Sequence, residues 1–224
     1  MKKFVTITGS NGSLASELIK IFLKENYGLI LHLRKPNNNL KKILKKYNKK
    51  LDYNLIYGDI RKKSTLEKIS RFIKLKKSNI LINNCGVYLS KPFSKTTQKE
   101  INDIFNINFF SNIYLLKKIY NYKFKEFLVV NINSIAGING SKNESIYSSS
   151  KHALKGFYES LEYEKNTNFR YLNIFSGAFK SKITKNRDTY EKLIEPSELA
   201  QIIQNNIINY KNSSINNLFV KRRK

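Results

Sequence analysis

The pattern that most constrains this chain is a regular alternation between short apolar runs and stretches in which apolar residues recur with helical spacing. Between residues 40 and 51 the apolar side chains fall at positions i, i+3, i+4, i+7 and i+11, which gives one buried helical stripe. The runs between such stretches are mostly apolar and rich in β-branched residues, as in parallel strands buried on both faces. The alternation predicts an α/β fold with a doubly wound parallel sheet and helices on both faces.

The same pattern gives one continuous set of elements. A length of 224 residues suits a single core, and no repeat or linker interrupts the alternation. We therefore predict that residues 1–224 form one domain. The expected strands are residues 3–8, 28–34, 53–57, 79–83, 127–133, 170–175 and 218–220, and the expected helices are residues 14–26, 40–51, 64–76, 97–122, 147–164 and 196–210.

The chain is strongly basic, with 42 Lys and Arg against 16 Asp and Glu and a formal charge of +26. Such a charge is typical of proteins that bind nucleic acids. Here the lysines of residues 40–51 occupy the polar side of their helical stripe, and the chain is also rich in Asn, Ile, Tyr and Phe. We attribute the charge to a compositional bias and expect no specific nucleic-acid partner.

The other composition features narrow the class of protein. The single Cys excludes a disulfide framework and a multi-cysteine metal site, and we expect no bound metal. No apolar stretch approaches the length of a membrane span, and the N-terminus enters a predicted strand without a signal segment. We therefore expect a cytoplasmic protein with no membrane partner.

A glycine-rich turn joins the first predicted strand to the first predicted helix, with the sequence TGSNGSLA at residues 8–15. Gly9 would form the tight turn and Gly12 would let the backbone approach a pyrophosphate, whose charge the helix N-terminus stabilises. The alternative is an ordinary strand-to-helix turn with Ser13 as the N-cap. The predicted pyrophosphate contacts are Gly9, Ser10, Asn11, Gly12, Ser13 and Leu14.

The end of the second predicted strand indicates which nucleotide binds. NAD sites usually place an acid there to hold the ribose hydroxyls. This chain has Arg34 followed by Lys35 instead, and a guanidinium matches the geometry of a 2′-phosphate. We predict NADP as the cofactor. NAD stays open as the alternative, because many exposed positions of this chain are basic.

Two Tyr-x-x-x-Lys pairs occur, at Tyr147 and Lys151 and at Tyr114 and Lys118. With 14 Tyr and 35 Lys in 224 residues, chance alone gives about two such pairs, so the spacing by itself proves nothing. Context separates them, because Tyr114 lies within an amphipathic helical stretch, whereas Tyr147 opens a helix after a strand and a Ser/Gly-rich loop. Lys151 lies one helical turn beyond Tyr147, where its ammonium is expected to lower the Tyr147 pKa.

Further motifs occur in order along the chain. Gly58-Asp59-Ile60 and Asn83-Asn84-Cys85-Gly86 follow the third and fourth predicted strands, Asn108 lies in Ile-Asn-Phe, and Ser134 precedes Tyr147 by 13 residues. With the glycine-rich turn and the Tyr147 pair, these motifs make residues 4–220 resemble the short-chain dehydrogenase/reductase family. The resemblance implies a single NAD(P)-binding, Rossmann-type domain.

The resemblance also implies a reaction and an assembly. It implies an NADP-dependent oxidoreductase that transfers a hydride between nicotinamide and a small carbonyl or alcohol, and that forms a homodimer or homotetramer. Tyr147 would be the general acid and base, Ser134 would bond the substrate oxygen, and Lys151 would hold the nicotinamide ribose. Asn108 would support a water-linked proton path to Lys151.

Other cofactor contacts follow from the resemblance alone. Four positions depart from the family pattern, because Ser13 and Ala15 replace glycines, Ser176 replaces the Pro of Pro-Gly, and Ser181 replaces Thr. The contacts implied outside the glycine-rich turn are Asp59 and Ile60 at the adenine, and Asn84, Gly86, Tyr147, Lys151, Gly177 and Ser181 toward the nicotinamide half.

Several alternatives stay open. A non-catalytic NAD(P)-binding or redox-sensing protein on the same fold is the alternative function. In residues 177–195, where the family sets its substrate choice, Lys180, Lys182, Lys185 and Arg187 favour an anionic substrate or simply reflect composition. Cys85 is predicted to be a small core residue rather than a nucleophile, and His32 and His152 to be packing or surface residues.

Overall fold

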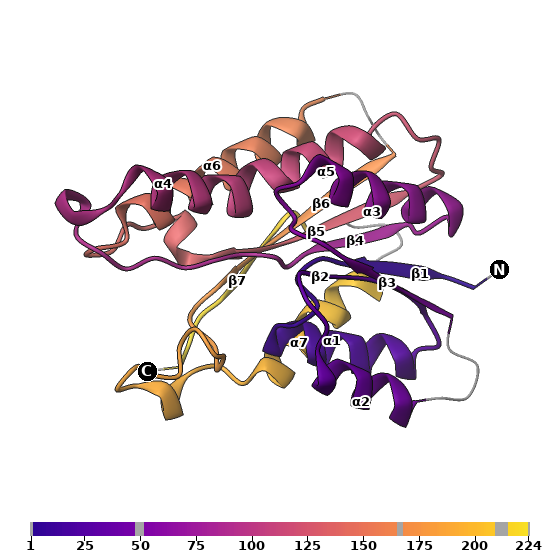
Figure 1. Cartoon of the computed structure of the whole chain (residues 1–224), viewed down its shortest axis with the longest axis horizontal. Helices are drawn as coiled ribbons and strands as arrows, with labels where there is room; N and C mark the ends of the chain where they lie inside the picture. The colour runs from indigo at the N-terminus through magenta and orange to yellow at the C-terminus, as the bar shows by residue number, and fades with distance from the viewer. Residues whose placement is uncertain (1, 48–51, 165–167, 209–214, 224) are drawn as a thin grey trace.

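The computed structural model describes residues 2–47, 52–164, 168–208 and 215–223. They form one sheet of seven parallel strands, as predicted, and the strand order is β3-β2-β1-β4-β5-β6-β7 (Figure 1). The strand order reverses between β1 and β4, and in such sheets ligands bind at the carboxyl ends of the strands beside that reversal. The strands are β1 Phe4–Ile7, β2 Gly28–Leu33, β3 Tyr53–Tyr57, β4 Ile80–Asn83, β5 Phe127–Ser134, β6 Phe169–Ser176 and β7 Asn217–Val220.

Helices cover both faces of the sheet, and each face has its own apolar core (Figure 1). One face carries α1 Ser13–Lys24, α2 Asn38–Lys46 and α7 Pro196–Ile208, and the other carries α3 Lys63–Leu75, α4 Gln98–Phe105, α5 Ser111–Ile119 and α6 Ser145–Glu162. The predicted ends of two helices, at residues 48–51 and 209–210, lie outside the described residues. Among the helices that are described, none has the length and apolar character needed to cross a membrane.

The predicted helix over residues 97–122 is not one regular helix. Thr97 is the N-cap of α4 and forms a capping box with Glu100. A π-helical turn at Asn106–Phe110 then separates α4 from α5, and it carries the buried Asn108. Most other boundaries agree with the prediction to within one or two residues; at the site, β5 extends through Ser134 and α6 begins two residues before Tyr147.

A ladder of asparagine side chains, buried on β4, β5 and β6 and half-buried on β7, crosses the sheet. Asn83 Nδ2 donates to Asn131 Oδ1 at 3.0 Å, Asn131 donates to Asn173 at 3.1 Å, and Asn173 donates to Asn217 at 3.2 Å. These residues are direct partners in the strand register. Because a register slip would leave buried amides unpaired, the ladder fixes the alignment of the strands that carry the site.

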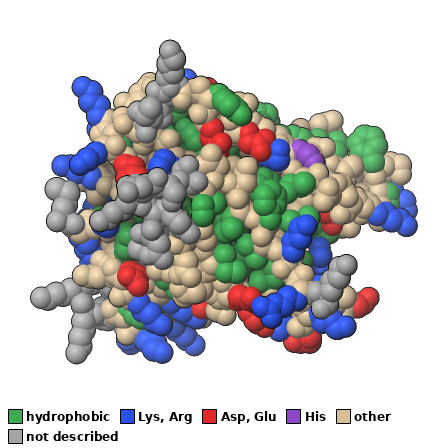
Figure 2. Space-filling view, turned by 180° about the vertical axis from the view of Figure 1, so that it is seen from behind, with side chains coloured by type: hydrophobic (Ala, Val, Ile, Leu, Met, Phe, Trp, Pro, Cys, Tyr) green, Lys and Arg blue, Asp and Glu red, His purple; other side chains and the backbone are tan. Residues whose placement is uncertain are grey.

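The positive charge does not form one continuous surface on the face seen in Figure 2. Lys and Arg side chains lie there in separate groups, with acidic side chains between several of them and apolar side chains in the middle (Figure 2). Scattered cations of this kind solvate a surface without forming the single basic stripe that tracks a nucleic-acid backbone.

Candidate functional site

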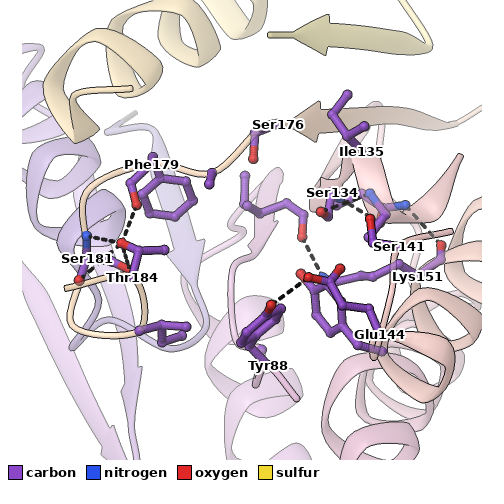
Figure 3. Close-up of a pocket in the computed structure, with 18 of the residues that line it drawn as sticks. Tyr88, Ser134, Ile135, Ser141, Glu144, Lys151, Ser176, Phe179, Ser181 and Thr184 are labelled. Carbon is purple, nitrogen blue, oxygen red and sulfur yellow. Dashed lines mark hydrogen bonds between the residues drawn. The ribbon is translucent and has the colours of Figure 1, made fainter. Parts of the chain in front are cut away.

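A cavity of about 300 Å³ opens at the carboxyl ends of β4, β5 and β6 (Figure 3). Its walls come from the loop after β4, the end of β5, the first turns of α6 and the loop after β6. Segments far apart in sequence therefore meet beside the strand-order reversal. The predicted residues that line this cavity are Asn84, Gly86, Ser134, Tyr147, Lys151, Gly177 and Ser181.

Tyr147 and Ser134 form a hydrogen-bonded pair at the cavity wall. Tyr147 lies in the first turn of α6, and Ser134 ends β5, where its Oγ also accepts from the Ala136 backbone N–H at 3.1 Å. Burial raises the pKa of Tyr147 to about 12, while the hydrogen bond with Ser134 acts to lower it and the Glu144 charge adds to the increase. Tyr147 is therefore protonated at neutral pH.

Lys151 lies beneath Tyr147 and is only 6% exposed. Its Nζ donates to the Ile132 carbonyl at 3.1 Å and lies 5.9 Å from the centroid of the Tyr147 ring. Burial lowers the pKa of Lys151 to about 8. The sequence predicted a Tyr147 pKa lowered by this ammonium, and the direction found is the opposite, because desolvation is the largest influence on both groups.

Asn108 lies behind the cavity wall, where it joins the loop after β4 to α6. Its Oδ1 accepts from the Val87 N–H at 2.8 Å, and its Nδ2 donates to the Val87 carbonyl at 2.9 Å and to Ser150 Oγ at 3.1 Å. A Cβ at Gly86 would lie 3.4 Å from Asn108 Oδ1 and 3.9 Å from Lys151 Nζ. Because residue 86 has no side chain, its backbone lies close to both Asn108 and Lys151.

The glycine-rich turn has the shape that its sequence predicts. Gly9 has a φ of +66°, and a Cβ there would lie 2.8 Å from the Cys85 Cα, so only glycine fits. Gly12 is the N-cap of α1, which corrects the alternative in which Ser13 caps the helix. Burial raises the pKa of the Cys85 thiol to about 11, in line with a packing residue rather than a nucleophile.

Hydrogen bonds from Ser10 and Asn11 within the turn, and from Asn84 after β4, hold the rest of the glycine-rich turn. Ser10 Oγ donates to the Ile7 carbonyl at 2.9 Å, and Leu14 is buried in the core, so these two side chains face inward. Asn11 Nδ2 donates to the Lys35 carbonyl at 3.1 Å, and Asn84 Nδ2 donates to the Gly9 carbonyl at 2.9 Å. The loops after β2 and β4 therefore hold the glycine-rich turn from both sides.

His32 is a residue of this site that sequence reasoning missed. It is 1% exposed, its Nδ1 accepts from the Gly9 N–H at 3.4 Å, and its Nε2 donates to the Gly58 carbonyl at 3.0 Å. Burial lowers its pKa, which favours the neutral ring that these two bonds require. Its place near the end of β2, between two glycine turns, is the signal that could have found it.

The three residues predicted at the adenosine end lie in different environments. Arg34 is exposed directly after β2. The Arg61 guanidinium hydrogen-bonds Asp59 at 3.0 Å and lowers the pKa of that carboxyl to about 2, and it also pairs with Asp103 on α4. Ile60 is buried in the core. Asp59 is thus engaged by a neighbouring cation, while the Arg34 side chain lies at the surface.

The opposite wall of the cavity is the loop after β6. The Ser181 N–H donates to Thr184 Oγ1 at 2.9 Å, and Thr184 Oγ1 donates to the Phe179 carbonyl at 2.8 Å (Figure 3). These bonds close a compact turn from Phe179 to Thr184, and the turn fixes the position of Ser181 at the cavity.

Tyr88 and Glu144 also line the cavity, and sequence reasoning missed both. The Tyr88 hydroxyl donates to Glu144 Oε1 at 2.5 Å (Figure 3). The Tyr88 ring packs edge-to-face on the Tyr147 ring, with centroids 5.0 Å apart. Tyr88 and Glu144 are 56 residues apart in sequence, so no local pattern joins them. The site therefore combines a phenol that can give or take a proton with a glycine-rich helix N-terminus suited to phosphate.

Comparison with known proteins gives the same assignment as the motifs. Residues 3–192 match the family described as short chain dehydrogenase. A 3-oxoacyl-[acyl-carrier-protein] reductase of Buchnera aphidicola is 31% identical over 194 residues, which cover 85% of this chain and 79% of that protein. A 3-ketodihydrosphingosine reductase of Bacteroides thetaiotaomicron is 24% identical over 194 residues, which cover 84% of this chain and 68% of that protein.

A solved structure extends the match to the fold. A short-chain dehydrogenase/reductase from Brucella melitensis superposes with a TM-score of 0.87 at 20% identity, covering 99% of this chain and 98% of that one. Since the family match spans most of the sequence and the fold agrees along nearly its whole length, this chain belongs to the short-chain dehydrogenase family of oxidoreductases.

Proposed function

We propose that this chain is a single NAD(P)-binding domain that transfers a hydride between NADP and a small carbonyl or alcohol, with Tyr147 as the general acid and base. The observation that carries the proposal is the meeting of Tyr147, Ser134 and Lys151 in one cavity beside the glycine-rich turn. The Buchnera and Bacteroides relatives are both named as reductases of keto compounds, which supports a carbonyl substrate.

The residues present fit a dinucleotide. Only glycine fits at Gly9, and Gly12 offers no side-chain oxygen to the first N–H groups of α1, which leaves them for a phosphate. Asn84 and Gly86 would meet the nicotinamide half, with Gly177 and Ser181 on the facing wall. When bound, the nicotinamide supplies or accepts the hydride.

In the reducing direction Tyr147 donates a proton to the carbonyl oxygen, and in the oxidising direction it accepts one from the alcohol. Its raised pKa keeps it in the protonated, donating form at neutral pH. Ser134 bonds the same oxygen where negative charge develops. Lys151 is protonated below pH 8, and its ammonium favours the phenolate that remains after proton transfer. Asn108 holds the wall behind Lys151, and a water between them would complete the proton path.

Arg34 would select NADP by pairing with the 2′-phosphate. Its exposed guanidinium follows β2 directly, at the position where an acid would favour NAD. We expect Arg34→Ala to raise the Kd of NADPH at least 10-fold and that of NADH less than threefold, measured by nicotinamide fluorescence. An equal change for both nucleotides would leave the preference to other residues.

The test of the function is a panel of small aldehydes, ketones and alcohols, followed by nicotinamide absorbance. We expect faster reduction of a carbonyl compound with NADPH than with NADH, and faster oxidation of an alcohol with NADP than with NAD. Binding of either nucleotide without turnover of any compound would favour the non-catalytic alternative, and no nucleotide binding at all would overturn both.

The proposal includes a cytoplasmic homodimer or homotetramer. The exposed rings of Phe110 and Tyr114 stack with centroids 5.8 Å apart at the start of α5, and exposed aromatic pairs of this kind suit a helix-to-helix interface. Sedimentation at micromolar concentration is expected to give a species of two or four chains, and a monomer there would overturn the assembly.

A further inference from the structure

The loop after β6 carries four lysines and Arg187, and these cations lie in different environments. Lys180 is paired with Glu191 at 3.1 Å and with Glu195 at 2.6 Å, so its charge is neutralised locally. Lys182, Lys185 and Arg187 all have exposed side chains, and of these three Arg187 is the one that lines the cavity. The general basicity of the chain explains an exposed lysine, but it does not explain a guanidinium at the wall of the candidate active site.

Arg187 is linked to the reacting phenol through one aromatic ring. Its guanidinium carbon lies 5.3 Å from the centroid of the Tyr88 ring, and that ring packs 5.0 Å from the Tyr147 ring. These two separations limit the distance from the guanidinium carbon to the Tyr147 ring to about 10 Å. The stacked contact on Tyr88 holds the fork of the guanidinium while its N–H donors stay available for a ligand.

An acid bonds the hydroxyl of the same tyrosine. Glu144 precedes α6 and accepts the Tyr88 hydroxyl proton at 2.5 Å. Figure 3 shows Tyr88 and Glu144 together, with the turn that carries Ser181 and Thr184 across the cavity from them. Arg187 comes from that same loop. The cavity wall therefore carries a carboxylate that accepts from the Tyr88 hydroxyl and a guanidinium over the Tyr88 ring, and an anion is favoured at the guanidinium.

We propose that Arg187 is a substrate-binding residue and that the preferred substrate is a small oxo acid or hydroxy acid whose carboxylate pairs with its guanidinium. The carbonyl or hydroxyl would then lie at Tyr147 and Ser134, a few carbon atoms from the carboxylate. This inference rests on the proposed function and names its substrate class. A carboxylate matches the planar fork of a guanidinium, and the cavity volume of about 300 Å³ suits a small molecule.

The test compares acids with their own methyl esters, so that only the charge changes. The probes are acetoacetate and levulinate, each beside its methyl ester, reduced with NADPH by the native protein and by single variants. Arg187→Met is expected to lower kcat/KM for the acids about 10- to 100-fold, mainly through KM, and to leave the esters within about twofold. Arg187→Lys should recover part of the loss, because it restores the charge without the fork.

Two further variants test whether charges inside the cavity, rather than elsewhere on the same loop, determine the preference for acids. Glu144→Gln is expected to raise kcat/KM for the acids about threefold or more, because it removes a negative charge from the cavity. Lys185→Met removes a positive charge from the same loop outside the cavity, and it should leave both classes of probe unchanged. An equal loss for acids and esters in Arg187→Met would overturn the inference and give Arg187 a structural role.

The outcomes also separate this inference from the proposed function. Reduction of the esters with no preference for the acids in the native protein overturns the carboxylate preference and leaves the oxidoreductase assignment intact. Absence of turnover with every carbonyl compound, acid or ester, overturns the proposed function itself.

Discussion

Two helices on the same face of the sheet carry the same Tyr-x-x-x-Lys spacing, and they differ in almost everything else. On α6, Tyr147 and Lys151 line a cavity, and Lys151 is only 6% exposed. On α5, Tyr114 is 53% exposed, and Lys118 pairs with Glu67 of α3 at 3.3 Å. The four-residue spacing places the Tyr and the Lys of each pair on the same face of their helix, but it does not determine whether that face lies at a cavity or in solvent.

The difference comes from where each helix begins. Helix α6 begins at Ser145, close to the carboxyl end of β5, so Tyr147 in its first turn meets Ser134 at the sheet edge where ligands bind. Tyr114 comes well along the helical path that starts at Gln98, past the π-helical turn and on the solvent side. A short motif thus becomes a candidate site only through the strand end that it faces.

The largest expected difference between the two pairs is the loss of turnover when the tyrosine hydroxyl is removed. Tyr147→Phe removes the proton donor, and we expect kcat to fall about 100- to 10,000-fold, with the Kd of NADPH changed less than threefold. The matched variant Tyr114→Phe removes a hydroxyl from the exposed pair, and we expect activity within twofold of native. Stopped-flow reduction and fluorescence titration measure the two quantities. Wild-type turnover by Tyr147→Phe would remove Tyr147 from the mechanism.

Much of the fold could be predicted because its signals are local. Apolar runs and helical stripes identified the strands and helices, and the glycine-rich turn could be recognised because Gly9 needs a positive φ. The π-helical turn at Asn106–Phe110 could not, because one inserted residue per turn barely disturbs the apolar spacing. The asparagine ladder depends on strand register, which only the assembled sheet defines.

The site residues that belong to motifs in a fixed order along the sequence could be predicted, whereas the contacts between loops could not. Ser134, Tyr147 and Lys151 come together as their order and spacing implied. Tyr88 and Glu144 meet only because two loops fold over one cavity. The direction of the Tyr147 pKa was wrong for the same reason, since burial is a property of the packed structure and outweighs the nearby ammonium.

A second, smaller effect concerns the two lysines and pH. The pKa of Lys151 falls from 10.5 to about 8 on burial, so its charged form destabilises the folded state at neutral pH. The folded protein loses this proton near pH 8 and the unfolded chain near 10.5, so the destabilisation is present below pH 8 and disappears as pH rises between the two values. The linked free energy is roughly 3 kcal/mol.

Urea unfolding of native protein and Lys151→Met across this range measures that effect. The stability of the variant relative to native should fall, by an amount of that order, as pH rises from 8 to 10.5. The Lys118→Met variant, on α5, is expected to show a difference from native that stays constant over the same range. A constant difference for Lys151→Met as well would mean that Lys151 titrates normally and is not desolvated.

The smallest expected effect is the contribution of the Lys118–Glu67 ion pair to the stability of the fold. Lys118 and Glu67 are 25% and 50% exposed, and an ion pair so open to water contributes only about 0.2–1 kcal/mol, less at high salt. A double-mutant cycle of Lys118→Met and Glu67→Gln by urea unfolding should give a coupling in that range at low salt and near zero at high salt, with turnover unchanged throughout. A coupling well above 1 kcal/mol would make Lys118 a tether between α3 and α5. In that case both Tyr-x-x-x-Lys lysines would be held in place by contacts with other elements of the fold, and only the cavity beside Lys151 would distinguish the two pairs.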